Sequence, residues 1–239
     1  LGEVRGTTDV IVSEIRPIPL YQHVLIGHRL IDLFSEPGKV NPEILGLERE
    51  ALRRVKIPRH RRDRYGDNDN RLTRADVIEK LQRENLLPAI TFIFSRAGCD
   101  AAVKQCLHAG IKLTNTEERA EILATAARFT QNLAEDDREV LGYNDWLLAL
   151  ERGIAAHHAG LLPSFKGAVE DLFKRGLVKA VFATETLALG INMPARTVVL
   201  EKLTKWNGEA HVSITPGEYT QLTGRAGRRG IDIEGNAVV

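Results

Sequence analysis

Cysteine is scarce in this sequence, and its scarcity excludes two classes of protein. Only Cys99 and Cys106 occur among the 239 residues, and no further Cys or His stands beside them at metal-ligand spacing. A disulfide framework and a structural zinc site are therefore not expected. The chain is expected to fold in a reducing, cytoplasmic setting.

Long apolar runs and an excess of charge of one sign are also lacking. No run approaches the roughly 18 apolar residues of a transmembrane helix, and the first residues lack the pattern of a signal peptide, so no membrane partner is expected. The formal net charge is +1, which neither requires nor excludes a nucleic-acid partner. The first residue is Leu1 rather than Met, which indicates an internal piece of a longer protein.

Short apolar runs alternate with helical patterns from Pro88 onward. Residues 89–94, 153–157, 179–184 and 197–200 are predicted strands, and residues 98–108, 116–134, 136–150 and 163–175 are predicted helices. Such repeated units imply right-handed crossovers and an α/β fold with a mainly parallel sheet flanked by helices. Ligands bind such sheets at the carboxyl ends of the strands, where we expect Ser95, Thr184 and the loop at His158.

The first third of the chain is patterned differently. Residues 21–26 and 29–34 are predicted to form a hairpin that turns at Gly27 and His28, and residues 42–56 a helix. Thr73 and Asp76 form a capping-box pattern for a helix that reaches about Asn85. Between them, the basic run at 59–64 precedes turn formers at 66–70. That loop is either a nucleic-acid contact or a solvated insertion.

A second hairpin is predicted near residue 207. Asn207 and Gly208 can supply the two positive φ angles of a type I′ turn, which would place Trp206 and Glu209 beside the tip. Trp206 then either stacks on a base or folds onto the domain. The adjacent His157 and His158 point to opposite faces of an extended chain, so they do not form a metal pair by themselves.

Residues 221–230 (QLTGRAGRRG), here called the arginine stretch, contain three glycines and three arginines. Arginine donates in a fork that matches phosphate oxygens, and glycine allows close approach of the backbone to a ligand. If the stretch opens a helix, Arg225 and Arg228 leave from one face toward a polyphosphate. A basic turn on a solvated surface is the alternative. Upstream, the Thr184 hydroxyl can bind a phosphate oxygen, and Gly190 and Asn192 allow close approach and a polar contact.

Four segments in this order resemble the motifs of one family. Residues 91–96 (TFIFSR) look like motif IV, 157–162 (HHAGLL) like motif IVa, 183–194 (ATETLALGINMP) like motif V, and the arginine stretch like motif VI. The chain resembles the second RecA-like domain of superfamily 2 helicases, in the Ski2-like DExH group. Nearly the whole chain is covered, and residues 15–20 are similar to the family's connector from the first domain.

The resemblance implies a role for each matching position. The chain would be the second motor domain of an ATP-dependent nucleic-acid helicase, which grips a single strand of DNA or RNA. Arg225 and Arg228 would be arginine fingers that reach the γ-phosphate of ATP on the first domain. The implied ATP-site residues are Gln221, Gly190, Asn192 and Gly224, and the implied nucleic-acid contacts are Ser95, Arg96, His158, Gly160, Thr184 and Glu185.

One departure from the family is important. The chain contains neither a Gly-x-x-x-x-Gly-Lys-Ser/Thr loop nor an Asp-Glu-x-His box. ATP and Mg²⁺ would therefore be held mainly by a first RecA-like domain upstream of Leu1, and the fragment alone would lack ATPase activity. The resemblance also implies three parts, namely a connector with a hairpin at 1–34, a helical and basic-loop insertion at 35–88, and the RecA-like core at 89–239.

Two other functions remain open at this stage. The chain could be a nucleic-acid-binding or scaffolding module whose motor has degenerated, although the intact arginine stretch argues against this. It could also belong to a translocase that remodels complexes without separating strands. Backbone phosphates are common to DNA and RNA, so these motifs do not distinguish the two substrates.

Overall fold

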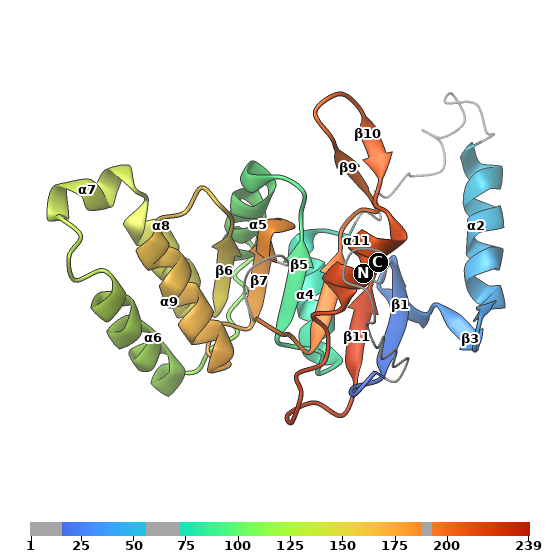
Figure 1. Cartoon of the computed structure of the whole chain (residues 1–239), viewed down its shortest axis with the longest axis horizontal. Coiled ribbons are helices and arrows are strands. Elements are labelled where there is room, and N and C mark those ends of the chain that lie inside the picture. Colours follow the sequence, from blue (N-terminus) through green and yellow to red (C-terminus); the bar gives the residue numbers. More distant parts are fainter. Residues whose placement is uncertain (1–15, 56–71, 188–192) are drawn as a thin grey trace, which may run out of the picture.

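A seven-stranded sheet forms the centre of the computed structural model, which describes residues 16–55, 72–187 and 193–239 (Figure 1). The strand order is β2-β1-β11-β8-β5-β7-β6, and only β1 and β2 pair antiparallel. The predicted α/β fold with a mainly parallel sheet is confirmed. The strands are β1 (Leu20–Ile26), β2 (Arg29–Asp32), β5 (Ala89–Phe92), β6 (Ile154–His157), β7 (Ala180–Ala183), β8 (Thr197–Leu200) and β11 (Gly235–Val238).

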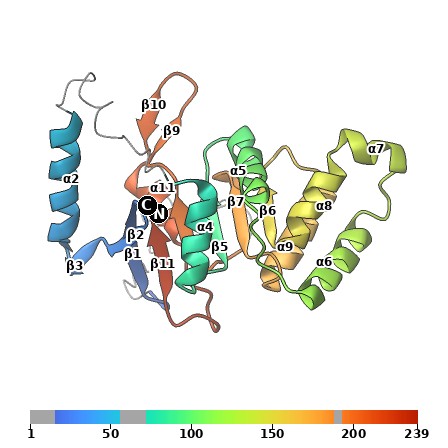
Figure 2. The same cartoon turned by 180° about the vertical axis from the view of Figure 1, so that it is seen from behind.

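Helices cover both faces of the sheet, which explains why its inner strands are mostly apolar and buried along their whole length. Every residue of β5, β7, β8 and β11 is buried, as expected for strands between two helical layers. Alternate residues face opposite layers: Ile90 packs in the cluster of α9 (Pro163–Lys174) and α11 (Pro216–Thr223). Ala89 packs in the cluster of α4 (Arg74–Arg83) and α5 (Arg96–His108), which lie in front of the sheet in Figure 2.

The helices between α5 and β6 in the chain differ from the prediction in number. The segment expected to form two helices forms three, α6 (Thr116–Phe129), α7 (Glu135–Val140) and α8 (Tyr143–Glu151). The single helix expected over 136–150 is wrong, because Gly142 has a φ of +65° and ends α7. Trp146 of α8 stacks on Phe165 of α9, with ring centroids 4.1 Å apart.

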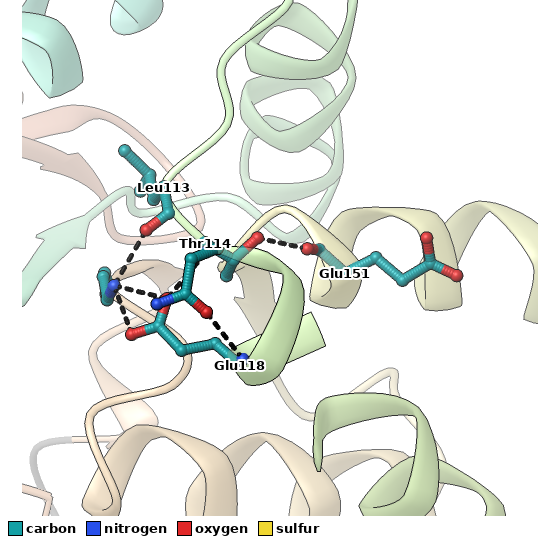
Figure 3. A network of polar contacts seen from close by, with 6 residues as sticks. Leu113, Thr114, Glu118 and Glu151 are labelled. Atoms are coloured by element: carbon teal, nitrogen blue, oxygen red, sulfur yellow. Dashed lines mark hydrogen bonds and ion pairs between the residues drawn. The ribbon is translucent and has the colours of Figure 1, made fainter. Parts of the chain in front are cut away.

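A polar network fastens this helical end to the amino end of the sheet (Figure 3). Lys179 precedes β7, and its ammonium donates to the Glu118 carboxylate of α6 at 2.7 Å and to the Leu113 carbonyl at 2.8 Å. The Thr114 hydroxyl donates to the carbonyl of Glu151 at the end of α8. Burial alone would raise the pKa of Glu118, but the hydrogen bonds from Lys179 and Asn115 N and the charge of Lys179 together outweigh it, and the pKa is lowered. Glu118 thus stays charged as part of this junction.

The first third of the chain extends the sheet. The hairpin that turns at Gly27 and His28 is confirmed, and its first strand, β1, pairs in parallel with β11. A small ribbon of β3 (Phe34–Glu36) and β4 (Lys39–Val40) leads to α2 (Pro42–Val55). The capping box of Thr73 and Asp76 is present at the start of α4. The three-part division stays a prediction, and the basic run at 59–64 lies outside the described residues.

The second hairpin consists of β9 (Thr204–Trp206) and β10 (His211–Ser213), which project from the sheet (Figure 1). The predicted type I′ turn is wrong. Trp206 pairs with His211, so the loop holds four residues, and only Gly208 has a positive φ, of +109°. The Asn207 side chain accepts hydrogen bonds from Glu209 N and Ala210 N and closes the loop instead.

Candidate functional site

Three predicted site residues lie at the carboxyl ends of neighbouring strands. Ser95 lies beyond β5, His158 beyond β6 and Thr184 beyond β7. These strands are adjacent and run parallel, so the three residues share one edge of the sheet. The placement expected from the sequence is confirmed.

At this edge, Ser95 and Arg96 begin α5. The Ser95 hydroxyl accepts a hydrogen bond from Gly98 N at 3.2 Å, which caps the helix. The hydroxyl hydrogen remains available as a donor. Arg96 is exposed in the first turn. This corner can therefore offer a hydroxyl and a guanidinium to an anion.

The His158 ring is held inside the neighbouring loop. Gly160 N donates to His158 Nδ1 at 3.2 Å, and His158 Nε2 lies 2.9 Å from the Asp100 carboxylate. Because Nδ1 accepts, the ring hydrogen sits on Nε2 and is donated to Asp100. The side chain is only 6% exposed. His158 therefore shapes the loop at Gly160. Gly160 is exposed and lies beside Arg96, since a methyl group added to Gly160 would lie 3.7 Å from Arg96 Cδ.

An ion-pair network follows β7. The Thr184 hydroxyl shares a hydrogen bond with the Thr186 hydroxyl at 2.9 Å. The Glu185 carboxylate lies 2.9 Å from the Lys205 ammonium, and Lys205 lies 2.6 Å from Glu218. Lys205 belongs to β9 and Glu218 to α11, so one ammonium joins the loop after β7, the hairpin and the helix.

The charges of this network stabilise one another. Hydrogen bonds to Glu218 and Glu185 raise the pKa of Lys205. The bond from Lys205, followed by those from Thr215, lowers the pKa of Glu218 to about 2. Lys205 and Glu218 are therefore both charged at neutral pH. A carboxylate repels phosphate, so this arrangement favours a structural role for Glu185 over the predicted nucleic-acid contact.

The part of the arginine stretch that carries Arg225 and Arg228 lies at the opposite, amino-terminal end of the strands. It does not open a helix, because Thr223 ends α11 and Arg225 and Arg228 follow that end. Ala195 lies just before β8. Its backbone N donates to Arg225 O at 2.9 Å, and its carbonyl oxygen accepts from Gly227 N at 2.7 Å. Gly227 permits this course with a φ of +86°. The arginines are therefore placed by the backbone course and not by a helix face.

Arg228 is paired with a residue that sequence reasoning missed. Its guanidinium donates to both carboxylate oxygens of Asp232, from Nε at 2.8 Å and from Nη2 at 2.9 Å. Arg228 also lines a cavity of about 340 Å³ with Pro88 and Lys179, at the start of β5. The four-residue spacing from Arg228 to Asp232 is visible in the sequence, but whether the two side chains pair depends on the turn between them.

Gln221 and Gly224 occupy the end of α11. Gln221 lines a different cavity from Arg228, of about 210 Å³, together with Glu185 and Lys205. A methyl group on Gly224 would lie 2.8 Å from the Thr220 carbonyl oxygen, so only glycine fits there. Within the described part of the chain, Gln221 and Arg228 therefore line different cavities.

Arg16 is a further residue that the sequence did not suggest. Its Nη2 donates to the carbonyl oxygens of Thr223 and Ala226. Thr223 is the last residue of α11, and Ala226 lies three residues after it. A cation at a helix C-terminus stabilises the unpaired carbonyls there. Arg16 therefore helps to fix the start of the arginine stretch.

The hairpin places one aromatic ring near the Ser95 corner. Trp206 is 56% exposed, and its ring contacts His211 edge to face at 5.3 Å. Trp206 also lines a cavity of about 280 Å³ with Ser95 and Lys202. The ring remains accessible to a planar ligand.

Two predicted residues, Gly190 and Asn192, lie outside the described residues. Within 16–55, 72–187 and 193–239, no group of three or more His, Cys, Asp or Glu side chains could hold a metal ion. None of the helices described is both long enough and apolar enough to cross a membrane.

Comparisons with known proteins identify the family of the chain. The model of the family described as helicase conserved C-terminal domain matches residues 107–230. The chain is 57% identical over 250 residues to the probable helicase HelY of Mycobacterium leprae, across 99% of the chain and 27% of the relative. It is 38% identical over 272 residues to a chloroplastic DExH-box ATP-dependent RNA helicase of Arabidopsis thaliana, across 100% of the chain and 23% of the relative.

A third relative is the antiviral helicase SKI2 of Saccharomyces cerevisiae, 38% identical over 173 residues, across 72% of the chain and 13% of the relative. These matches confirm the resemblance to the Ski2-like DExH group. The chain spans 27% of the length of the HelY relative.

Proposed function

Because the chain belongs to the helicase conserved C-terminal domain family, we propose that it is the second motor domain of an ATP-dependent helicase. In this proposal it grips a nucleic-acid strand and supplies arginine fingers to ATP bound on a first motor domain. It closes on that domain when ATP binds and reopens after hydrolysis. The nucleic-acid strand then advances relative to the protein by one step in each cycle of ATP hydrolysis.

The observation that carries the proposal is the separation of two sets of anion-binding groups on one sheet. Ser95 and Arg96 lie at the carboxyl ends of the strands, whereas Arg225 and Arg228 lie beyond the amino ends. The first set suits the backbone phosphates of a single strand of DNA or RNA, with Thr184 and Gly160 as further contacts. Phosphate contacts of this kind give binding without sequence preference.

The second set of groups is proposed to act on a nucleotide held elsewhere. The chain has no Gly-x-x-x-x-Gly-Lys-Ser/Thr loop, so we propose that ATP and Mg²⁺ are bound mainly by the first motor domain. Arg225 and Arg228 would stabilise the negative charge that develops on the transferred phosphoryl group, a contribution of about 10³ to 10⁵ in rate. Gly190, Asn192 and Gln221 are proposed to line the edge of that site.

Substitution of Arg228 in the full-length protein tests the finger assignment. Arg228→Ala is expected to abolish ATP hydrolysis while ATP binding, measured with a fluorescent nucleotide, is retained. An unchanged kcat would refute the assignment. The isolated 1–239 chain is expected to show no ATPase activity, and robust turnover stimulated by nucleic acid would contradict the need for a first domain.

The short hairpin favours a second candidate function. Strands β9 and β10 have three residues each, which makes a small wedge, so an ATP-driven translocase that does not separate strands is the alternative. Strand displacement measured in parallel with single-strand ATPase activity distinguishes the two. The relative from Arabidopsis is named an RNA helicase, and comparing ATPase stimulation by matched DNA and RNA strands identifies the substrate of this chain.

A further inference from the structure

We infer that Asp232 is a positioning residue for Arg228, which holds the guanidinium by one edge so that its other edge is free to donate to a phosphate group. This inference rests on the proposed function, since it specifies how one arginine finger is oriented. Asp232 would not touch the nucleotide itself. It would act only through Arg228.

The pairing between the two side chains is side-on. Arg228 Nε donates to Asp232 Oδ2 at 2.8 Å, and Arg228 Nη2 donates to Oδ1 at 2.9 Å. This geometry uses one hydrogen of Nη2 and leaves the second, together with both hydrogens of Nη1, as donors. Among the described residues, none accepts a hydrogen bond from Nη1 of Arg228. A phosphate can therefore take two parallel bonds from the end of the guanidinium without breaking the pair with Asp232.

The Asp232 carboxylate is a fixed anchor. Its side chain is only 5% exposed, compared with 20% for Arg228, and Oδ2 also accepts from Arg228 N at 2.9 Å. Burial alone would raise the pKa of Asp232, but the hydrogen bonds from Arg228 and the nearby charge of Arg196 outweigh it and lower the pKa. The carboxylate is therefore charged at neutral pH and accepts three hydrogen bonds from Arg228.

Few other contacts orient Arg228. The turn that carries it closes through Ile231 N and Asp232 N, which both donate to Arg228 O, at 3.1 and 2.9 Å. These bonds fix the backbone but not the side chain. Ile231 and Ile233 are 68% and 85% exposed, so they form no packed wall around it. The cavity of about 340 Å³ that Arg228 lines leaves room for other rotamers once Asp232 is removed.

The first test is Asp232→Asn in the full-length protein, with steady-state ATPase kinetics in saturating single strand. Asparagine has the same size but turns an NH₂ group toward one guanidinium N–H, which repels it. We expect kcat to fall by about 10- to 100-fold, the range for lost outer support or a misplacement near 1 Å, while KM for ATP is unchanged. Asp171→Asn is the matched control, because Asp171 also pairs with an arginine four residues away, Arg175, but on the exposed surface of α9. It should leave kcat unchanged.

A double-mutant cycle separates positioning from general stability. Asp232→Asn should lower kcat strongly with Arg228 present and hardly at all in an Arg228→Lys background. Equal factors in both backgrounds, or a normal kcat for Asp232→Asn alone, would overturn the positioning role. A normal kcat for Arg228→Lys would instead refute the finger assignment in the proposed function. If Asp232→Asn unfolds, Asp232→Glu keeps the charge and moves the carboxylate by one methylene, and a normal kcat for that variant overturns the inference.

Discussion

Gly235 is the position where a single methyl group should disturb both stability and the arginine stretch. It opens β11 directly beneath the loop that carries Arg225 and Arg228. A Cβ at this position would lie 2.6 Å from the carbonyl carbon of Ala226 and 2.6 Å from Gly227 N. Carbon contacts normally lie at about 3.5–4.0 Å. Both neighbours are backbone atoms that have no rotamer to change, so the strand and the loop must separate by about 1 Å.

The expected cost follows from that separation. Forcing extra volume into packed structure costs about 1–3 kcal/mol, and for a unit of this size each kcal/mol lowers the melting temperature by about 2–4 °C. The bond from Gly227 N to Ala195 O, now 2.7 Å long, would be the first to stretch. If the arginines act on ATP, a displacement of about 1 Å should also reduce kcat by about 10²-fold.

The assay compares Gly235→Ala with Gly46→Ala in the full-length protein. Gly46 lies within α2, and a methyl group there would meet nothing within 4 Å. Alanine is a better helix former than glycine by about 1 kcal/mol, so the control should melt at the same temperature or slightly higher. Melting is followed by circular dichroism and hydrolysis by phosphate release. A Gly235→Ala protein that melts and turns over like the wild type would refute the close crossing at Ala226.

Three further predictions address other parts of the chain. Glu218, with its pKa lowered from 4.5 to about 2, contributes stability above pH 4.5 that is lost as the pH falls toward 2. The stability gap between wild type and Glu218→Gln should therefore close over that window, and a constant gap would contradict the ion pair. Burial raises the pKa of Cys99 and Cys106 to about 12, so iodoacetamide at pH 8 should label neither thiol until denaturant unfolds the chain; rapid labelling of the native protein would count against their burial. Arg96→Ala should reduce the salt dependence of single-strand binding by a slope of about 0.7, whereas Arg83→Ala, whose side chain pairs with a neighbour in α4, should not, and equal slopes for both variants would exclude Arg96 as a phosphate contact.

Local pattern was sufficient to predict most elements of this fold. Strands such as β5 and β8 are mostly apolar runs because both of their faces are covered, and Thr73 caps α4 because the capping box is complete within four residues. The signal and the structure it determines lie in the same short segment. The placement of Ser95 at a strand end followed from the same reasoning.

Features that depend on distant partners could not be predicted in this way. The loop at Asn207 holds four residues because the strand register places Trp206 opposite His211, and register is a property of two strands together. Lys205 joins Glu185 and Glu218, which are 20 and 13 residues away along the chain. The sequence shows these charges, but only the course of the backbone brings them into contact.

Helix α11 has a thermodynamic consequence that follows from its position. Its first turn holds Glu218, which is bonded to Lys205 at the carboxyl edge, and its last residue, Thr223, leads into Arg225. An eight-residue helix is about 12 Å long. If a nucleic-acid strand and a nucleotide each bind more tightly to the same position of this helix, the two binding equilibria are linked. The factor by which the strand tightens nucleotide binding must then equal the factor by which the nucleotide tightens the grip on the strand.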